Sequence, residues 1–387
     1  MSSGRQAIGL RILFSLLLAL SSLTATLTAL VSGVAPALAD NRAVPDWPDD
    51  WQATDLRDHP LNGKIWSREK RNFVSPQDYG TRLAQTRFTL LGEVHDNPDH
   101  HRLQAWAIRA ISKLRGARIL EGAPQMDAVA MEMLSADNQE ALDRFYGRNV
   151  RVPRSRTAAD FGRLVKWDKL GWPPFEIYAP IIEAALNAYL VITPANPARA
   201  ETRKVSKDGL GALPVEEVKR LALDRLLPPE QAKALEREIR ESHCGMLPDT
   251  AVPNMSLVQR LRDANMANAM LVSQSKGAAL IAGNGHVRRD RAVPWYMEAR
   301  NIPASDMVVV RHIEVEAGKV NPDDYGLGAS GDAADLADFV VFTPREPRPD
   351  SCEQMRQQVE SMKSQRRSRE EPAKNDTSDS ATSTPPR

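Results

Sequence analysis

The strongest structural signal in the sequence is the stretch Phe88-Thr89-Leu90-Leu91-Gly92-Glu93-Val94-His95-Asp96-Asn97-Pro98-Asp99-His100-His101. Its apolar start predicts a buried strand, and a cluster of histidines and carboxylates follows directly. Asn97 suits the N-cap of a helix and Pro98 its first position, so we expect a helix to begin there. The cluster then lies at a strand-to-helix junction, where open α/β sheets bind ligands.

The alternation of strand and helix recurs along the chain. We expect strands at 88–91, 118–120, 190–193, 278–282, 307–310 and 339–342. Helical periodicity marks 99–114, 126–134, 175–188, 229–242 and 257–273. This pattern predicts an α/β fold with a mostly parallel sheet flanked by helices. Helical insertions at about 124–172 and 204–254 are expected to form a cap subdomain over one end of the sheet.

The first 39 residues have the pattern of an export signal. Two arginines precede the apolar stretch Ile12–Leu20, and Ala37-Leu38-Ala39 is a small-residue cleavage site. We therefore expect a mature periplasmic protein that begins near Asp40. The alternative is an uncleaved anchor, because 12–38 is long enough to span a membrane. No cysteine lies near the cut, so a lipoprotein is not expected.

Three further regions follow the signal. Residues 40–80 are expected to form an irregular arm whose Trp47 and Trp51 pack onto the body. Residues 81–344 are expected to form the α/β domain. The remainder, 345–387, is rich in Pro, Ser, Thr and charged residues and poor in apolar ones, so we expect a disordered tail.

Charge and cysteine content exclude several classes of protein. Lys and Arg number 51 against 50 Asp and Glu, so the formal charge of +1 offers no basic excess for nucleic acid. Cys244 and Cys352 are too few for a disulfide framework. A single bridge is chemically allowed, but the position of Cys352 in a polar tail argues against it. The sequence also has no HExxH, CxxC, Walker, GxGxxG or GxSxG motif.

The functional candidates follow the expected strands. Glu93 and His95 follow the first strand, Glu121 the second, and His286 the Gly283-Asn284-Gly285 turn. The carboxyl ends of parallel strands share one edge, so we expect these side chains to meet in one crevice, with the glycines allowing close backbone approach. For Glu121, a structural role as a helix cap or in an ion pair is an equal alternative to a place in the crevice.

Other polar and aromatic residues have competing interpretations. His100 and His101 are adjacent on a helix, so one is expected to face the crevice and the other solvent. His243 closes a helix and can interact with its C-terminus. The aromatic run Trp167–Tyr178 offers a flat apolar surface with a phenol, although core packing is favoured slightly.

Five motifs together resemble the ChaN-like haem-binding uptake family, which is related to the Tiki and erythromycin-esterase-like groups. They extend over about Leu83–Val315 and are Leu91-Gly92-Glu93-Val94-His95-Asp96-Asn97 with His100-His101, Trp172-Pro173 to Tyr178-Ala179-Pro180, His243-Cys244-Gly245-Met246, Arg262-Asp263 with Met266-Ala267, and Gly283-Asn284-Gly285-His286. The resemblance implies an α/β core with a helical subdomain and haem binding in iron acquisition. In some members, a dimer holds two stacked haems through tyrosine ligands.

This resemblance sets the expected ligands and partners. Tyr178 and Tyr146 are the tyrosine candidates, and the candidate haem-binding histidines are His95, His100, His101, His243 and His286. The implied partners are haem, a second copy of the chain and outer-membrane components of haem or iron uptake. Related groups use Glu and His of the first and last motifs in catalysis or metal binding.

Three functions remain open from the sequence. The leading one is an exported haem-binding protein with a Tyr or His as axial ligand in an apolar pocket. The alternative is a metal-dependent hydrolase, in which Glu93, His95, Glu121 and His286 hold a divalent ion or activate water. In the third, the protein is a periplasmic interaction module that uses its arm and tail.

Overall fold

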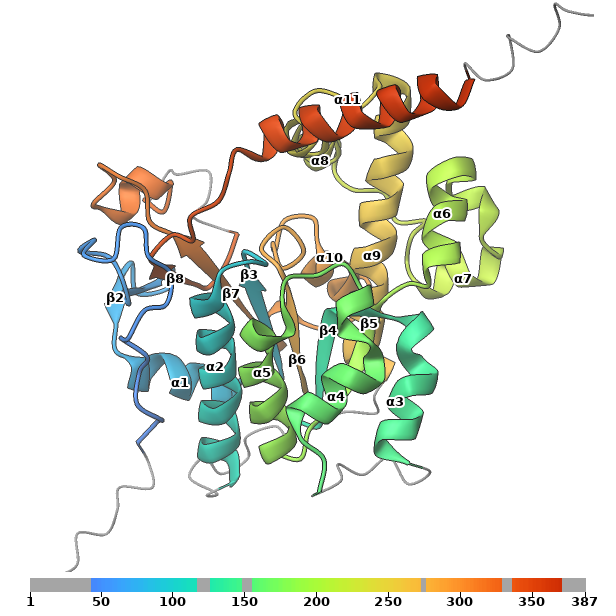
Figure 1. Cartoon of the computed structure of the whole chain (residues 1–387). Helices are drawn as coiled ribbons and strands as arrows, with labels where there is room; N and C mark the ends of the chain where they lie inside the picture. Colours follow the sequence, from blue (N-terminus) through green and yellow to red (C-terminus); the bar gives the residue numbers. More distant parts are fainter. Residues whose placement is uncertain (1–42, 117–125, 148–154, 273–275, 329–335, 371–387) are drawn as a thin grey trace, which may run out of the picture. The chain divides into compact units, whose positions relative to one another are not determined.

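The structured part of the chain is organised around one sheet (Figure 1). The computed structural model describes residues 43–116, 126–147, 155–272, 276–328 and 336–370. Its strands are β1 (Ile65–Ser67), β2 (Asn72–Val74), β3 (Phe88–Glu93), β4 (Ala128–Ser135), β5 (Val191–Asn196), β6 (Ala278–Gly283), β7 (Met307–Glu314) and β8 (Phe339–Thr343).

These strands form one eight-stranded sheet in the order β2-β1-β8-β7-β3-β6-β4-β5. The pairs from β8 to β5 are parallel, and β1 pairs antiparallel with both β2 and β8. The predicted α/β fold with a mostly parallel sheet is confirmed. Every residue of β3 and β6 is buried, as expected for central strands with helices on both faces. The strand predicted at 118–120 lies outside the described residues.

Helices cover both faces of the sheet (Figure 1). On one face lie α1 (Pro76–Gln85), α2 (Pro98–Gly116), α3 (Gln139–Tyr146), α4 (Ala158–Val165) and α5 (Phe175–Asn187), whose apolar side chains form one core cluster. The second cluster, on the other face, includes side chains from α6 (Arg199–Asp208), α9 (Val252–Val272) and α10 (Val293–Glu298), with α7 (Val215–Arg220) beside them.

The remaining helices are two long ones and several short turns. They are α8 (Pro229–Ser242), α11 (Ser351–Glu370) and the 3-10 helices Ala136–Asn138, Trp167–Lys169, Gly209–Ala212, Asp249–Ala251, Ala304–Asp306 and Pro322–Tyr325. The helix predicted to begin at Pro98 is confirmed, because the Asn97 side chain accepts hydrogen bonds from the backbone N–H groups of Asp99 and His100. No helix in the described part of the chain is long and apolar enough to cross a membrane.

The predicted helix at 126–134 is wrong, because β4 occupies 128–135. Ala, Met and Leu in this run favour helix, but their burial on both sides between β5 and β6 selects the strand. Tertiary pairing outweighs propensities of a few tenths of a kcal/mol per residue. The insertion predicted at 124–172 is therefore not a helical cap: it contains β4, and α3 and α4 belong to the layer over the sheet.

Both flanking regions are more ordered than predicted. Trp47 of the arm packs against Trp106 with 4.8 Å between ring centroids, as predicted. The arm is nevertheless not irregular throughout, because β1, β2 and the start of α1 lie within 40–80. The tail prediction is wrong for Ser351–Glu370, which forms α11. The prediction counted apolar burial alone, whereas a covalent bond and ion pairs hold the start of this segment.

A disulfide bond joins Cys244, just after α8, to Cys352 in the first turn of α11. The expectation against this bridge is wrong. The prediction against the bridge failed because the tail was expected to be disordered, and a disordered tail would leave Cys352 without a fixed neighbour. The bond attaches α11 to the end of α8.

Candidate functional site

The candidate site lies where β3 and β6 end side by side. The chain leaves β3 toward β4 and leaves β6 toward β7, in opposite directions across the sheet. Such a switch point opens a crevice at the carboxyl edge. A cavity of about 640 Å³ lies here. The strand ends supply Glu93, His95 and His286, so their predicted convergence is confirmed.

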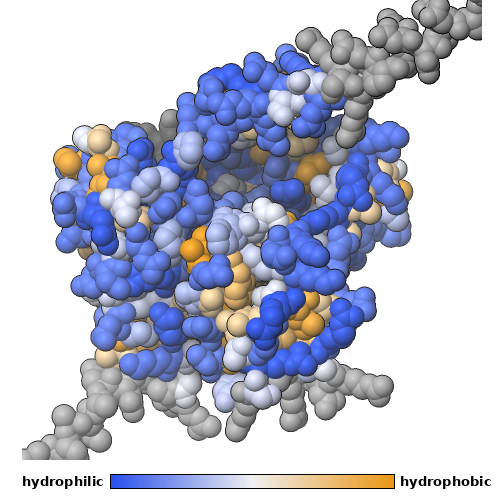
Figure 2. Space-filling model, in the orientation of Figure 1, coloured by the Kyte–Doolittle hydropathy of each residue, from blue (hydrophilic) through white to orange (hydrophobic). Residues whose placement is uncertain are grey.

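Helices α8 and α9 complete the walls of this cavity. Leu235 and Ile239 of α8 give it an apolar side, and Asp263 comes from α9. Of the helical insertion predicted at 204–254, α8 forms this wall of the cavity, whereas α6 and α7 pack over a face of the sheet. Figure 2 shows a predominantly hydrophilic face that is hollowed, with hydrophobic residues visible in the hollow.

His95 is the most accessible histidine of the cluster, with 34% of its side chain exposed. Its Nδ1 lies 2.9 Å from Glu93 Oε1, and its Nε2 lies 3.8 Å from Glu132 Oε2. Burial would lower the pKa of His95, but the hydrogen bond to Glu93 and the charge of Glu132 outweigh it, and the pKa is raised. Because Nδ1–H donates to Glu93, the neutral imidazole carries its lone pair on Nε2.

Glu93 is buried beneath His95 and is surrounded by donors. Tyr178 Oη lies 3.0 Å from Glu93 Oε1 and 3.1 Å from the carbonyl oxygen of His95, so it can donate to either. His101 Nε2 lies 3.3 Å from Glu93 Oε2. Burial alone would raise the pKa of Glu93, but His101 and His95 hold it well below its usual value. Glu93 is therefore an anion that orients His95.

His286 is held between two buried carboxylates. Its Nδ1 lies 2.6 Å from Asp263 Oδ1, and its Nε2 lies 3.4 Å from Glu132 Oε1. Burial disfavours the charged imidazole, but the charges of Glu132 and Asp263 raise the pKa of His286 to about 10. Burial likewise raises the pKa of Glu132, but His286 and His95 lower it to about 2. The pair is therefore imidazolium and carboxylate at neutral pH.

Sequence reasoning missed Glu132, which approaches both His95 and His286. A carboxylate inside the otherwise apolar run Ala128–Leu134 was the available signal. It went unused because this run was assigned to a helix. Asp263 appears in the Arg262-Asp263 motif, but its role as a partner of His286 was not predicted.

His100 forms a separate, closed pair with His312 of β7. Both side chains are fully buried, with 5.7 Å between ring centroids. His100 Nδ1 accepts the backbone N–H of Val94 at 2.8 Å, and His312 Nδ1 lies 2.6 Å from the carbonyl oxygen of Gly92. Burial lowers the pKa of His312 to about 4 and that of His100 well below its usual value. Both imidazoles are neutral, and their hydrogen bonds to the backbone of Val94 and Gly92 stabilise the turn after β3.

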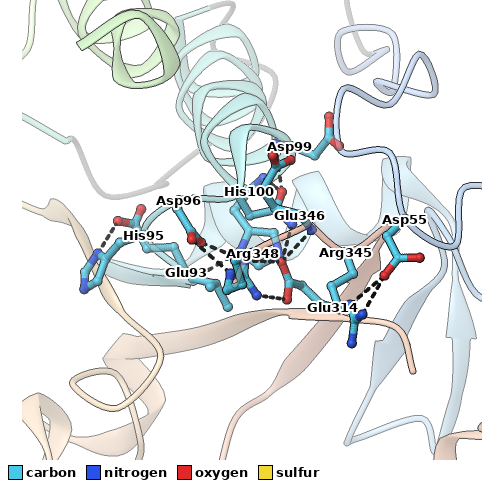
Figure 3. A network of polar contacts seen from close by, with 12 residues as sticks. Asp55, Glu93, His95, Asp96, Asp99, His100, Glu314, Arg345, Glu346 and Arg348 are labelled. Carbon is cyan, nitrogen blue, oxygen red and sulfur yellow. Dashed lines mark hydrogen bonds and ion pairs between the residues drawn. The ribbon is translucent and has the colours of Figure 1, made fainter. Parts of the chain in front are cut away.

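The turn after β3 is also tied to the segment that follows β8 (Figure 3). Arg348 donates to Asp96 at 2.7 Å and to Glu314 at 2.7 Å. In Figure 3, His95 extends away from this network, on the other side of Glu93. The ion pairs thus fix the turn from outside while His95 reaches into the cavity.

With this geometry, the chain can be compared with known proteins. The family of haem-binding uptake proteins of the Tiki superfamily, ChaN, matches residues 80–297. The chain belongs to this family. The matched range contains the ends of β3, β4 and β6 and therefore the whole histidine and carboxylate cluster.

One solved structure shares the fold, and two others are less similar. ChaN of Campylobacter jejuni, described with cofacial haem binding, has a TM-score of 0.55 at 20% identity and covers 72% of this chain and 95% of its own. The type III effector HopBA1 matches with a TM-score of 0.35 at 11% identity, covering 70% and 93%. A mutant of the erythromycin esterase EreC in its open conformation has a TM-score of 0.34 at 11% identity, covering 74% and 99%. No curated protein matches the sequence.

The other residues expected to bind haem in this ChaN family member lie away from the cavity. Tyr178 is fully buried, and Tyr146 accepts a hydrogen bond from the backbone N–H of Ile192 at 2.6 Å. His243 Nδ1 donates to the carbonyl oxygen of Ile239 at 2.7 Å, which is the predicted contact with a helix C-terminus. The expectation that either His100 or His101 faces solvent is wrong, because both are fully buried.

The predicted metal centre is not supported. Glu121 lies outside the described residues. Among the residues that are described, no group of three or more His, Cys, Asp or Glu side chains is arranged to hold a metal ion. The carboxylates of Glu93 and Glu132 are instead engaged by neighbouring imidazoles.

The aromatic run contributes mainly to the core, as the slightly favoured interpretation predicted. Trp167 and Tyr178 are buried in the cluster beneath α5. Trp172 differs, because its ring lies 4.8 Å from that of His95 and its Nε1 donates to the carbonyl oxygen of Met133. It therefore presents a fixed aromatic surface beside His95.

Proposed function

We propose that this ChaN family member binds haem for uptake, in the crevice at the carboxyl edge of the sheet, with His95 Nε2 as the axial ligand to iron. Membership of a haem-binding family supports the ligand. The single observation that carries the ligand assignment is the Glu93–His95 pair at 2.9 Å. A histidine that binds a metal generally donates its second ring N–H to a carboxylate or carbonyl, which fixes the tautomer.

The cavity has properties suited to a porphyrin. Its volume of about 640 Å³ falls within the range of cofactor pockets, roughly 300–1,000 Å³. Leu235 and Ile239 offer apolar contact to a ring face, and Trp172 packs beside His95. A bound haem would use its iron as the acceptor of the His95 lone pair.

The remaining candidates fit this role less well. His286 is held more tightly by carboxylates than His95, because its nitrogens lie 2.6 Å from Asp263 and 3.4 Å from Glu132 and its pKa is raised to about 10. Its Nε2 is therefore less available to iron than that of the more exposed His95, which lies 3.8 Å from Glu132. The hydroxyl of Tyr178 faces Glu93, and burial together with that charge raises its pKa. A tyrosine ligand needs the phenolate, which this position disfavours.

We also propose that the chain is exported and that its mature form begins near Asp40. The Cys244–Cys352 bond supports this, since disulfides persist in oxidising compartments such as the periplasm. N-terminal sequencing of protein from its native envelope should read Asp40-Asn41-Arg42. An intact Met1 chain in the membrane fraction would contradict export with cleavage.

A haemin titration of the mature protein tests the proposed function. We expect a saturable shift of the haem absorption band in the wild type. His95→Ala should abolish the shift or change it to that of a weaker ligand, with a melting temperature close to wild type. His243→Ala is the matched control and should leave the band unchanged, because its imidazole contacts α8 outside the cavity lining. A wild type without saturable change would refute haem binding.

A further inference from the structure

A second cavity lies on the other side of Glu132 from the crevice. It has a volume of about 370 Å³ and is referred to below as the basic cavity. Its lining includes Glu132, Trp172, Arg199, Arg203 and Arg262. Trp172 contacts the His95 ring, and Glu132 Oε2 lies 3.8 Å from His95 Nε2. The two cavities are therefore neighbours across His95.

The three arginines of the basic cavity have spare donors. Within the described part of the chain, neither the side chain of Arg262 in α9 nor that of Arg203 in α6 makes an ion pair or a hydrogen bond. Arg262 is half-buried, which makes an unpaired guanidinium there more costly than on an open surface. Arg199 donates one side-chain hydrogen bond, to the carbonyl oxygen of Leu170 at 3.2 Å.

The single carboxylate in this lining does not neutralise the arginines. Glu132 Oε2 accepts the backbone N–H of Gly283 at 2.8 Å, and Oε1 faces His286. Its charge is thus committed to the histidines of the crevice. The half-buried Arg262 and the exposed Arg199 and Arg203 remain to face an anion. Arginine forks match the geometry of a carboxylate.

In another arginine-rich cavity, two of the arginines are paired with a carboxylate. It lies by Met307 and Phe339, at the amino ends of β7 and β8. There Asp338 accepts hydrogen bonds from Arg68 at 3.1 Å and also from Arg289. Those two arginines share a carboxylate partner, whereas among the described residues the half-buried Arg262 of the basic cavity has none.

We infer that the basic cavity binds carboxylate groups of the ligand whose centre occupies the crevice; on the proposed function, which this inference rests on, these groups are the haem propionates. Trp172 would separate the two subsites, with the iron ligand on one side and the arginines on the other. The carboxylates of the ligand would then supply the partners that Arg262 and Arg203 lack. Specificity for an acidic porphyrin would come from this cavity rather than from His95.

Haemin and its dimethyl ester test this inference, because the ester has the same ring and iron but no propionate charge. Both are titrated in the same dilute detergent into the wild type, Arg262→Gln, Arg203→Gln and the control Arg71→Gln. Arg71 is exposed and lines the other arginine-rich cavity. A lost charge-assisted hydrogen bond weakens binding by about tenfold or more.

We expect the wild type to bind haemin at least about tenfold more tightly than the ester. Arg262→Gln should weaken haemin binding by a similar factor and leave ester binding unchanged. Arg203→Gln should weaken haemin binding less, because its side chain is exposed, and should also leave ester binding unchanged. Arg71→Gln should change neither. Equal wild-type affinity for haemin and ester, or an equal loss for both ligands in Arg262→Gln, would overturn the inference and leave haem binding standing. A wild type that binds neither porphyrin would overturn the proposed function and this inference together.

Discussion

The histidines at the end of β3 fall into two groups with opposite electrostatics. His95 and His286 lie beside Glu93, Glu132 and Asp263, and their pKa values are raised. His100 and His312 contact each other and neutral hydrogen-bonding groups, and their pKa values are lowered. Contact with a carboxylate and a place in the crevice lining therefore distinguish His95 and His286 from the pair that holds the turn in place. His101 also contacts Glu93 but is fully buried.

The largest expected effect tests the charged group. Glu132→Gln leaves the buried imidazolium of His286 with a single carboxylate partner, Asp263. Breaking a buried ion pair on one side costs about 3–5 kcal/mol, so the free energy of unfolding at pH 7 should fall by roughly that amount. Denaturant unfolding measures it. Glu140→Gln, which removes an exposed pair with Arg144, is the control and should stay within about 0.5 kcal/mol. Equal losses would mean that His286 is not charged in the folded protein.

A second prediction compares how the stability contributions of the two groups of histidines change with pH. His312 has a folded pKa of about 4 against 6.5 unfolded, so its contribution to stability is present above pH 6.5 and is lost as pH falls toward 4. The advantage of wild type over His312→Asn in unfolding free energy should shrink by about 3 kcal/mol between pH 7 and pH 4.

The matching variant on the other side is His95→Asn. The folded pKa of His95 is raised, so its contribution is present below the unfolded value and is lost as pH rises. The advantage of wild type over His95→Asn should hold or grow on acidification. Comparing each variant with wild type cancels the opposing effect of Asp263, whose pKa burial raises to about 6. The same slope for both variants would contradict the division into two groups.

The sequence predicted the parts of this division that depend on local pattern. The strand ending at Glu93, the helix beginning at Pro98 and the Gly283–His286 turn all follow from nearby residues, and their convergence follows from parallel strands. The sequence could not separate His100 from His95. That distinction depends on Val94, Thr343 and His312, and the last two come from strands more than two hundred residues away.

The errors have a common physical origin in contacts between distant segments. β4 was assigned to a helix because its residues have helix propensity, whereas pairing with β5 and β6 decides its state. This error also hid Glu132. Cys352 was placed in a disordered tail, although Cys244 and the ion pairs of Arg348 hold the segment at its start. The composition of a segment describes its own residues. It does not reveal the strand pairs, ion pairs and disulfide bonds that other parts of the fold form with it.

The smallest expected effect concerns how Glu93 prepares His95. Glu93→Gln keeps an oxygen for the Nδ1–H of His95 but removes the charge that makes the imidazole a stronger donor to iron. Loss of such a supporting carboxylate typically weakens metal binding about 10–100-fold, so haemin affinity should fall within that range while a histidine-type spectrum remains. Glu238→Gln is the matched control, because Glu238 also lines the crevice but pairs with Arg291 rather than with His95. Its haemin affinity should stay within about threefold of wild type, since partly exposed pairs contribute little. If the two variants bound haemin equally well, Glu93 would be a structural carboxylate like any other at this edge, and the charged histidine group would lose its link to the ligand.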